Sequence, residues 1–270
     1  MTHSPAFVAT IALCGGTSRR MGVPDKTALP FGEATILDSA LAGLPTGLVV
    51  CVGDPRPLRA PTPTVQVHGA PAPAAPADPL PLVWTRETPV GGGPVAGIRA
   101  GLDAVFAEFG APRRRHTPPA PTGPLGEHAE ATTAAGPPED DPFTHTEPLV
   151  AVIAGDQPFA GRVVPRLVPA LARRLRDTSP LDATPDGVAV AAPGRGGPSL
   201  LLAVYRLRAL DAAIGDDVID RGVYQTLRGL NVSVLDSERA EWQVDTDVLS
   251  LDVDDPDDLS RALAVLARLR

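Results

Sequence analysis

The sequence predicts an α/β fold in which a mainly parallel, Rossmann-like sheet forms the middle of three α/β/α layers. Short aliphatic runs alternate along the chain with segments of helical periodicity. Such alternation is typical of βαβ units, whose right-handed crossovers place helices on the faces of a parallel sheet. Size is the third observation: 270 residues with 43% hydrophobic content can bury a substantial core, so we expect one domain over residues 1–270.

The expected strands share a composition rich in aliphatic residues, which is typical of strands covered on both faces. In chain order they are Val8–Leu13, Leu48–Val52, Leu82–Trp84, Leu149–Ala154, Gly187–Ala192 and Leu200–Tyr205. The expected helices share apolar residues at three- and four-residue spacing. They are Thr35–Ala42, Val95–Phe109, Val163–Arg176, Leu207–Ile214, Val223–Gly229 and Pro256–Leu269. Because open sheets of this kind bind ligands beyond the carboxyl ends of their strands, we expect the functional residues in the loops at that edge.

Two proline-rich segments interrupt the alternation, residues 55–81 and residues 111–148. Both lack hydrophobic periodicity, so we predict loops there, the second a disordered surface insertion. A regulatory or partner-binding role for this insertion is the alternative to a simple solvated loop.

Composition argues against several classes of protein. A formal charge of −8 is opposite to the basic footprint that nucleic-acid-binding surfaces need. No apolar run approaches the roughly eighteen residues of a membrane span, so we expect no membrane contact. Cys14 and Cys51 lie in separate apolar runs without disulfide or metal-ligand spacing, which indicates structural thiols in a cytoplasmic protein.

The loop after the first expected strand is the most informative motif. It combines two adjacent glycines, a hydroxyl pair and three basic residues: Gly15, Gly16, Thr17, Ser18, Arg19, Arg20 and Lys26. Glycines let backbone N–H groups approach phosphate oxygens closely, while guanidinium and ammonium groups neutralise the charge. A tight turn followed by a solvated basic face would explain the same residues. The spacing fits neither the P-loop nor the dinucleotide-binding glycine pattern.

Acidic residues follow two later elements. Asp156 comes directly after the strand expected at Leu149–Ala154, at the same sheet edge, where a carboxylate can hold Mg²⁺; it could equally cap the helix that follows. Near the C-terminus, residues 251–259 read as a short strand, a cap at Asp254 or Asp255 and a helix that begins with proline. An EF-hand is excluded there, because its glycine and its final glutamate are missing.

A third loop, residues 87–98, is rich in glycine and opens a helix. On its own it indicates a flexible hinge.

Together these motifs resemble the MobA-like nucleotidyltransferases, the group that contains molybdenum cofactor guanylyltransferase. The resemblance rests on L-x-G-G-x-S-x-R-M-G-x-x-x-K at residues 13–26, G-D-Q-P-F at 155–159, G-P-V-A-G-I at 93–98 and the acidic segment at 251–259. It spans residues 8–268 without the two proline-rich segments, and the motifs follow the family's order. It implies the family's three-layer nucleotidyltransferase fold.

The resemblance also implies roles for individual residues. Arg20, Lys26 and Asp156 are the implied catalytic residues. Magnesium ligands would be Asp156 and Asp254, with Asp252 as the close substitute for Asp254. Glu87 would recognise guanine, whose N1–H and 2-amino groups a carboxylate can accept together. The complete nucleotide-binding set is Leu13, Gly15, Gly16, Thr17, Ser18, Arg20, Lys26, Glu87, Gly93, Pro94 and Gly97.

The implied reaction is Mg²⁺-dependent transfer of GMP from GTP to the phosphate of Mo-molybdopterin, with release of pyrophosphate, in molybdenum cofactor biosynthesis. GTP, this phosphorylated acceptor and the molybdoenzyme-maturation proteins are the implied partners. Gly197 stands where many members carry a polar residue, and Cys14 where alanine is common. Two alternatives remain open: a related cytidylyl- or guanylyltransferase with another phosphorylated acceptor, and a non-catalytic nucleotide-binding protein.

Overall fold

The computed structural model describes residues 4–15, 19–58, 81–113, 141–143, 146–179, 182–192, 197–235 and 246–269. Most of both proline-rich segments, together with Gly16, Thr17 and Ser18, lies outside these residues. The ends of the second proline-rich segment are described, and there the expectation of disorder is wrong. Ala111 and Phe143 are buried against the core, and a strand begins at Thr146.

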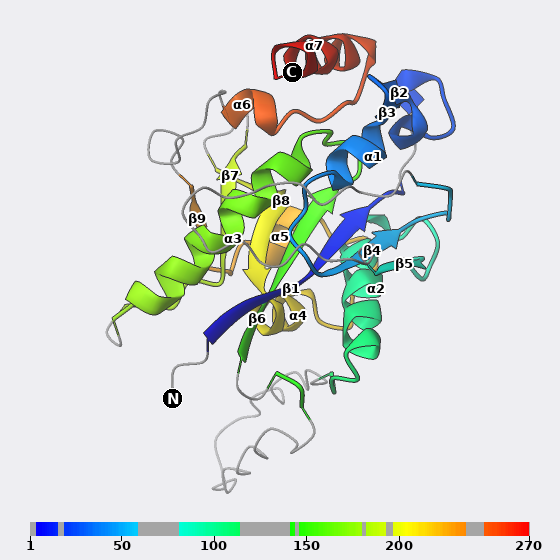
Figure 1. Ribbon diagram of the computed structural model, residues 1–270. Coiled ribbons are helices and arrows are strands. Elements are labelled where there is room, and N and C mark those ends of the chain that lie inside the picture. Colours follow the sequence, from blue (N-terminus) through cyan, green and yellow to red (C-terminus); the bar gives the residue numbers. More distant parts are fainter. Residues whose placement is uncertain are drawn as a thin grey trace, which may run out of the picture.

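A seven-stranded sheet forms the centre of the fold (Figure 1). In sheet order its strands are β5 (Leu82–Thr85), β4 (Leu48–Val52), β1 (Ser4–Leu13), β6 (Thr146–Ala154), β8 (Pro198–Arg206), β7 (Gly187–Ala191) and β9 (Val232–Val234). All neighbours pair in parallel except β8, which is antiparallel to both β6 and β7. The mainly parallel sheet is therefore confirmed, with one reversed strand that the aliphatic pattern did not reveal.

Helices cover both faces of the sheet. They are α1 (Ile36–Leu41), α2 (Gly93–Glu108), α3 (Ala160–Asp177), α4 (Leu207–Ile214), α5 (Val223–Leu227), α6 (Thr246–Leu249) and α7 (Pro256–Arg268). Along β6, Ala151 and Ile153 join the apolar cluster beneath α1 and α3, whereas Val150 and Val152 join the cluster beneath α2 and α4. Continuous apolar runs thus form strands buried on both faces. Among the described helices, none combines the length and apolarity needed to span a bilayer.

The carboxyl ends of four strands lie in register. Leu13 pairs with both Val52 and Ala154, and Val52 pairs with Thr85. Backbone hydrogen bonds continue past the strand ends, from the Gly155 N–H to the Leu13 carbonyl (2.8 Å) and from the Cys14 N–H to the Val52 carbonyl (2.8 Å). The loops that follow β1, β4, β5 and β6 therefore start side by side.

The remaining differences between the predicted and the observed elements concern short segments. The two-residue strands β2 (Pro30–Phe31) and β3 (Ala34–Thr35) are too brief to give a periodic signal. The prediction of a short strand within residues 251–259 is wrong, because these residues contain no strand. That segment bonds to a loop rather than to the sheet, because the Val253 N–H donates to the Asp156 carbonyl (3.0 Å).

Gly161, in the first turn of α3, allows this helix to approach the end of α1. A Cβ at Gly161 would lie 1.9 Å from the Ala42 carbonyl oxygen. We expect Gly161→Ala to lower the free energy of unfolding by about 2–3 kcal/mol and Tm by several degrees, as measured by thermal denaturation. Gly229→Ala is the control, because a Cβ there would meet no atom within 4 Å. Equal Tm values for the two variants would contradict the prediction.

Candidate active site

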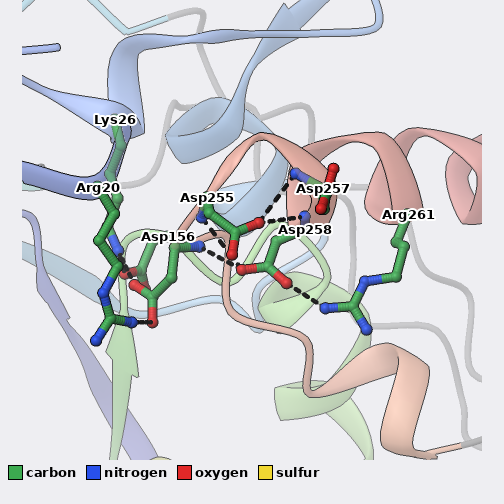
Figure 2. Close-up of polar contacts among 8 residues, drawn as sticks. Arg20, Lys26, Asp156, Asp255, Asp257, Asp258 and Arg261 are labelled. Carbon is green, nitrogen blue, oxygen red and sulfur yellow. Dashed lines mark hydrogen bonds and ion pairs between the residues drawn. The ribbon is translucent and has the colours of Figure 1, made fainter. Parts of the chain in front are cut away.

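Three side chains from distant parts of the sequence converge at the carboxyl edge of the sheet. The Lys26 Nζ lies 2.5 Å from Asp156 Oδ2 and 2.5 Å from Asp254 Oδ1 (Figure 2). Lys26 is the first residue of the 3₁₀ turn η2 (Lys26–Ala28), Asp156 follows β6, and Asp254 precedes α7. The ammonium thus neutralises two carboxylates that would otherwise repel each other.

Burial and charge act in opposite directions on Lys26. The side chains of Lys26 and Asp156 are only 16% and 17% exposed. Burial on its own would lower the pKa of Lys26, but the charges and hydrogen bonds of Asp156 and Asp254 outweigh it and raise this pKa above its ordinary value. Lys26 therefore carries a positive charge at this edge of the sheet at neutral pH.

Lys26 is also the only lysine in the chain, because the other 23 of its 24 basic Lys and Arg residues are arginines. The sequence analysis did not use this signal. All other Lys or Arg positions of the chain are occupied by arginine, whereas the position between two carboxylates is occupied by lysine. The compact ammonium of lysine and the planar guanidinium of arginine are not interchangeable at that position.

The segment before α7 is held in place by a capping box. The Asp255 carboxylate accepts hydrogen bonds from the N–H groups of Asp257 and Asp258 (2.9 Å each), and Asp258 in turn accepts from the N–H groups of Asp254 and Asp255 (Figure 2). The cap is thus Asp255, which leaves the Asp254 carboxylate to meet Lys26.

Gln157 fastens the same segment to the loop after β6. Its side-chain carbonyl accepts from the Ala154 N–H (3.1 Å), and its amide donates to Asp252 Oδ1 (2.7 Å). Desolvation and the negative charge of Asp156 raise the pKa of Asp252 to about 6, against the opposing effect of the Gln157 hydrogen bond. Asp252 thus serves as an attachment point, while Asp254 is the carboxylate beside Lys26. Sequence reasoning missed the attachment by Gln157.

The sequence predicts Asp156 to be either a metal ligand or the cap of the helix that follows, and the structure excludes the helix cap. The N-cap of α3 is Phe159 and makes no side-chain capping bond, so Asp156 does not cap this helix. Its Oδ1 is buried and has no hydrogen-bond partner among the described residues. Such an oxygen fits a hard cation, because carboxylate oxygens are the ligands that Mg²⁺ prefers. Within the described part of the chain, however, no three acidic, His or Cys side chains gather as a metal cluster.

Arg20 lies at the exposed side of the same group. Its NH1 is 3.8 Å from Asp254 Oδ2, and 78% of its side chain is exposed. A surface pair of this kind adds little stability, so the guanidinium is available to a ligand.

The loop after β5 approaches the glycine loop after β1. A Cβ at Gly15 would lie 3.9 Å from Glu87 Oε1, and Glu87 accepts a hydrogen bond from the Gly91 N–H (3.1 Å). Gly93 and Pro94 form the first turn of α2, whose N-cap Gly92 makes no side-chain capping bond.

Two of the candidate nucleotide-binding residues have a packing role. Gly97 is buried in α2, and a Cβ there would lie 3.0 Å from the side chain of Leu13, the last residue of β1. These residues hold α2 against the sheet. Gly16, Thr17 and Ser18 lie outside the described residues, so their positions are not compared with the prediction.

The chain is similar to several solved structures, of which the first named here has the same architecture. Molybdopterin-guanine dinucleotide biosynthesis protein A from Archaeoglobus fulgidus is 20% identical, with a TM-score of 0.52 over 97% of this chain and 100% of that chain. A mycobacterial homologue of Mycobacterium tuberculosis Rv0371c is 21% identical (TM-score 0.49; 97% and 98% covered). The 2-C-methyl-D-erythritol 4-phosphate cytidylyltransferase from Thermus thermophilus is 15% identical (TM-score 0.43; 97% and 100% covered).

No curated protein sequence matches the chain. The family described as the MobA-like NTP transferase domain, by contrast, matches residues 10–233, which include the end of β1, Lys26, Glu87 and Asp156. Since the match covers most of the sequence and the sheet has the corresponding α/β architecture, the chain belongs to the MobA-like NTP transferase family and is a nucleotidyltransferase.

Proposed function

We propose that the chain transfers GMP from GTP to the phosphate of Mo-molybdopterin, forming the guanine dinucleotide cofactor and releasing pyrophosphate. The observation that carries this proposal is the convergence of Lys26, Asp156 and Asp254 beside the glycine loop, at the sheet edge where ligands bind. A cation and two carboxylates at that place suit a nucleoside triphosphate with its metal. The choice of GTP and of this acceptor rests on the resemblance of the motifs.

In the proposed reaction an oxygen of the acceptor phosphate attacks the α-phosphorus of GTP, and the bond from that phosphorus to the β-phosphate oxygen breaks. The acceptor phosphate is already ionised at neutral pH, so the protein needs no general base. Catalysis is then positioning and neutralisation of charge. Lys26 would stabilise the charge at the α-phosphate, and Arg20 the charge of the departing pyrophosphate.

Asp156 and Asp254 are the residues that would hold Mg²⁺, with the unpartnered Asp156 Oδ1 as the oxygen directed to it. Divalent metals are common in nucleotidyltransferases of this family. Bound there, the ion would neutralise phosphate oxygens. Backbone N–H groups of residues 15–18 would hold the triphosphate. Cys14 and Cys51 are free thiols, which fits a reducing cytoplasm.

Glu87 provides the test of base specificity. We expect Glu87→Ala to lower kcat/KM for GTP by about ten- to a hundredfold, because a paired carboxylate contact to a base edge is worth about 1–3 kcal/mol. The value for CTP should change little, since cytosine does not offer the N1–H and 2-amino pair. Pyrophosphate release with GTP, CTP, ATP and UTP, in the presence of Mg²⁺ and the acceptor, measures both.

The same panel distinguishes the alternatives. A parent protein that prefers CTP would be a cytidylyltransferase, and the role of Glu87 would be wrong. GTP binding without pyrophosphate release, with Mg²⁺ and the acceptor present, would indicate a non-catalytic nucleotide-binding protein.

A further inference from the structure

Lys26 is fixed at its backbone as well as at its ammonium. The preceding residue, Asp25, is the N-cap of η2, and its Oδ1 accepts from both the N–H (2.9 Å) and the hydroxyl (2.7 Å) of Thr27. Thr27 is buried, so this turn packs into the protein rather than lying on its surface. The cap sets the direction in which the lysine side chain leaves the backbone.

The second oxygen of Asp25 is held by Arg56. The Arg56 guanidinium forms an ion pair with Asp25 Oδ2, and it lies over the ring of Trp84 in β5, 5.7 Å from the ring centroid. Arg56 comes from the loop after β4, and its side chain is 18% exposed. The pKa of Cys14, the residue after β1, is lowered by a hydrogen bond from Cys51 and by the charge of Arg56, which together outweigh the effect of burial.

We propose that Arg56 is a positioning residue for the transfer reaction, acting through Asp25 on Lys26; this rests on the proposed role of Lys26. The planar guanidinium is oriented by the Trp84 ring and by the carboxylate together, which a flexible ammonium could not match. Asp25 is thereby fixed at both oxygens. The turn then directs the single lysine between Asp156 and Asp254 rather than into solvent.

The need for such a device follows from the lysine itself. A lysine side chain has four rotatable bonds and considerable rotamer freedom. The two carboxylates alone therefore fix the position of its ammonium but not that of the turn that carries it. A displacement of about 1 Å at a reacting group can lower the rate by about a hundredfold. Arg56 fixes the starting point of the side chain through its ion pair with Asp25.

Activity in a double-mutant cycle tests this. We expect Arg56→Met to lower kcat by about ten- to a hundredfold and Arg56→Lys to restore part of it. In a Lys26→Ala background, Arg56→Met should lower kcat by no more than about twofold, because the group it positions is gone. An equal loss in both backgrounds would overturn the proposal.

Arg208→Met is the matched control. Arg208 also pairs with an aspartate, Asp141 (2.5 Å), lies 5.0 Å from the centroid of the Phe106 ring, and has a side chain 23% exposed. It belongs to α4 and contacts Pro112 and Asp141, the described ends of the 111–148 segment, away from Lys26. Loss of an arginine of this kind should leave kcat within about threefold of the parent. Equal losses for the two variants would mean that Arg56 only stabilises the fold.

A second measurement is independent of activity. Because Lys26 is the only lysine, it is the only side-chain amine that an acetylating reagent can modify. In metal-free buffer we expect Lys26 acetylation, measured by peptide mass spectrometry, to be several-fold faster in Arg56→Met and in Asp25→Asn, and unchanged in Arg208→Met. If the parent releases no pyrophosphate, the proposed reaction is wrong, and the acetylation rates still decide whether Arg56 orients Lys26. Equal rates in the parent and Arg56→Met would overturn the proposal.

Discussion

Replacing Lys26 by alanine should lower the turnover number by about a hundredfold or more, which is usual when a central electrostatic stabiliser is removed. The ammonium lies between two carboxylates, and the Lys26 side chain is only 16% exposed. A water molecule in its place would supply no positive charge to the phosphate. Pyrophosphate release at saturating GTP and Mg²⁺ measures the effect.

The variant Lys26→Arg tests whether a positive charge alone is sufficient at this position. It keeps the charge, but a planar guanidinium is larger than an ammonium and cannot lie 2.5 Å from both carboxylates with the same geometry. We expect it to be nearly as slow as Lys26→Ala. Circular dichroism should show both variants folded. Turnover within a few-fold of the parent in Lys26→Ala would remove Lys26 from the mechanism, and full activity in Lys26→Arg would show that charge alone is sufficient.

The fold could be predicted because its main elements are long and their patterns are local. β4 and α4 match the predicted ranges of Leu48–Val52 and Leu207–Ile214. Apart from the short strand expected within residues 251–259, the other predicted strands and helices are present and differ only at their ends. The reversed direction of β8 could not be predicted, because an aliphatic run buried on both faces looks the same in either direction. Strand β9, with three residues, is too short to stand out.

The sequence could predict only those site residues that directly follow a predicted strand. Asp156 and the glycine loop each follow a strand, and parallel strands bring their carboxyl ends together. Whether Asp252 or Asp254 meets Lys26 depends on the attachment by Gln157 and the capping box, which are long-range hydrogen bonds without a sequence signature. Arg56 lies at the edge of a proline-rich segment that gave no reason to single it out.

Asp156→Asn should lower turnover by about a hundredfold or more, although the new side chain has the same shape. Asparagine removes the charge that pairs with Lys26 and replaces one carboxylate oxygen by an NH₂ group, which cannot bind Mg²⁺. Since Asp156 Oδ1 is buried without a protein hydrogen-bond partner in the described part of the chain, this oxygen can bind a cation without breaking an existing bond. The Mg²⁺ concentration for half-maximal rate should therefore rise together with the fall in kcat.

Three further variants test which carboxylates are responsible for the Mg²⁺ requirement. Asp254→Asn should also raise the Mg²⁺ requirement, because Asp254 shares Lys26 with Asp156. Asp252→Asn should lower the rate less, since an amide oxygen can still accept the hydrogen bond from Gln157. Asp177→Asn, at the exposed end of α3, is the surface control. A greater loss in Asp252→Asn than in Asp254→Asn would reverse the assignment of the second ligand, and normal turnover in Asp156→Asn would show that the reaction does not depend on this carboxylate.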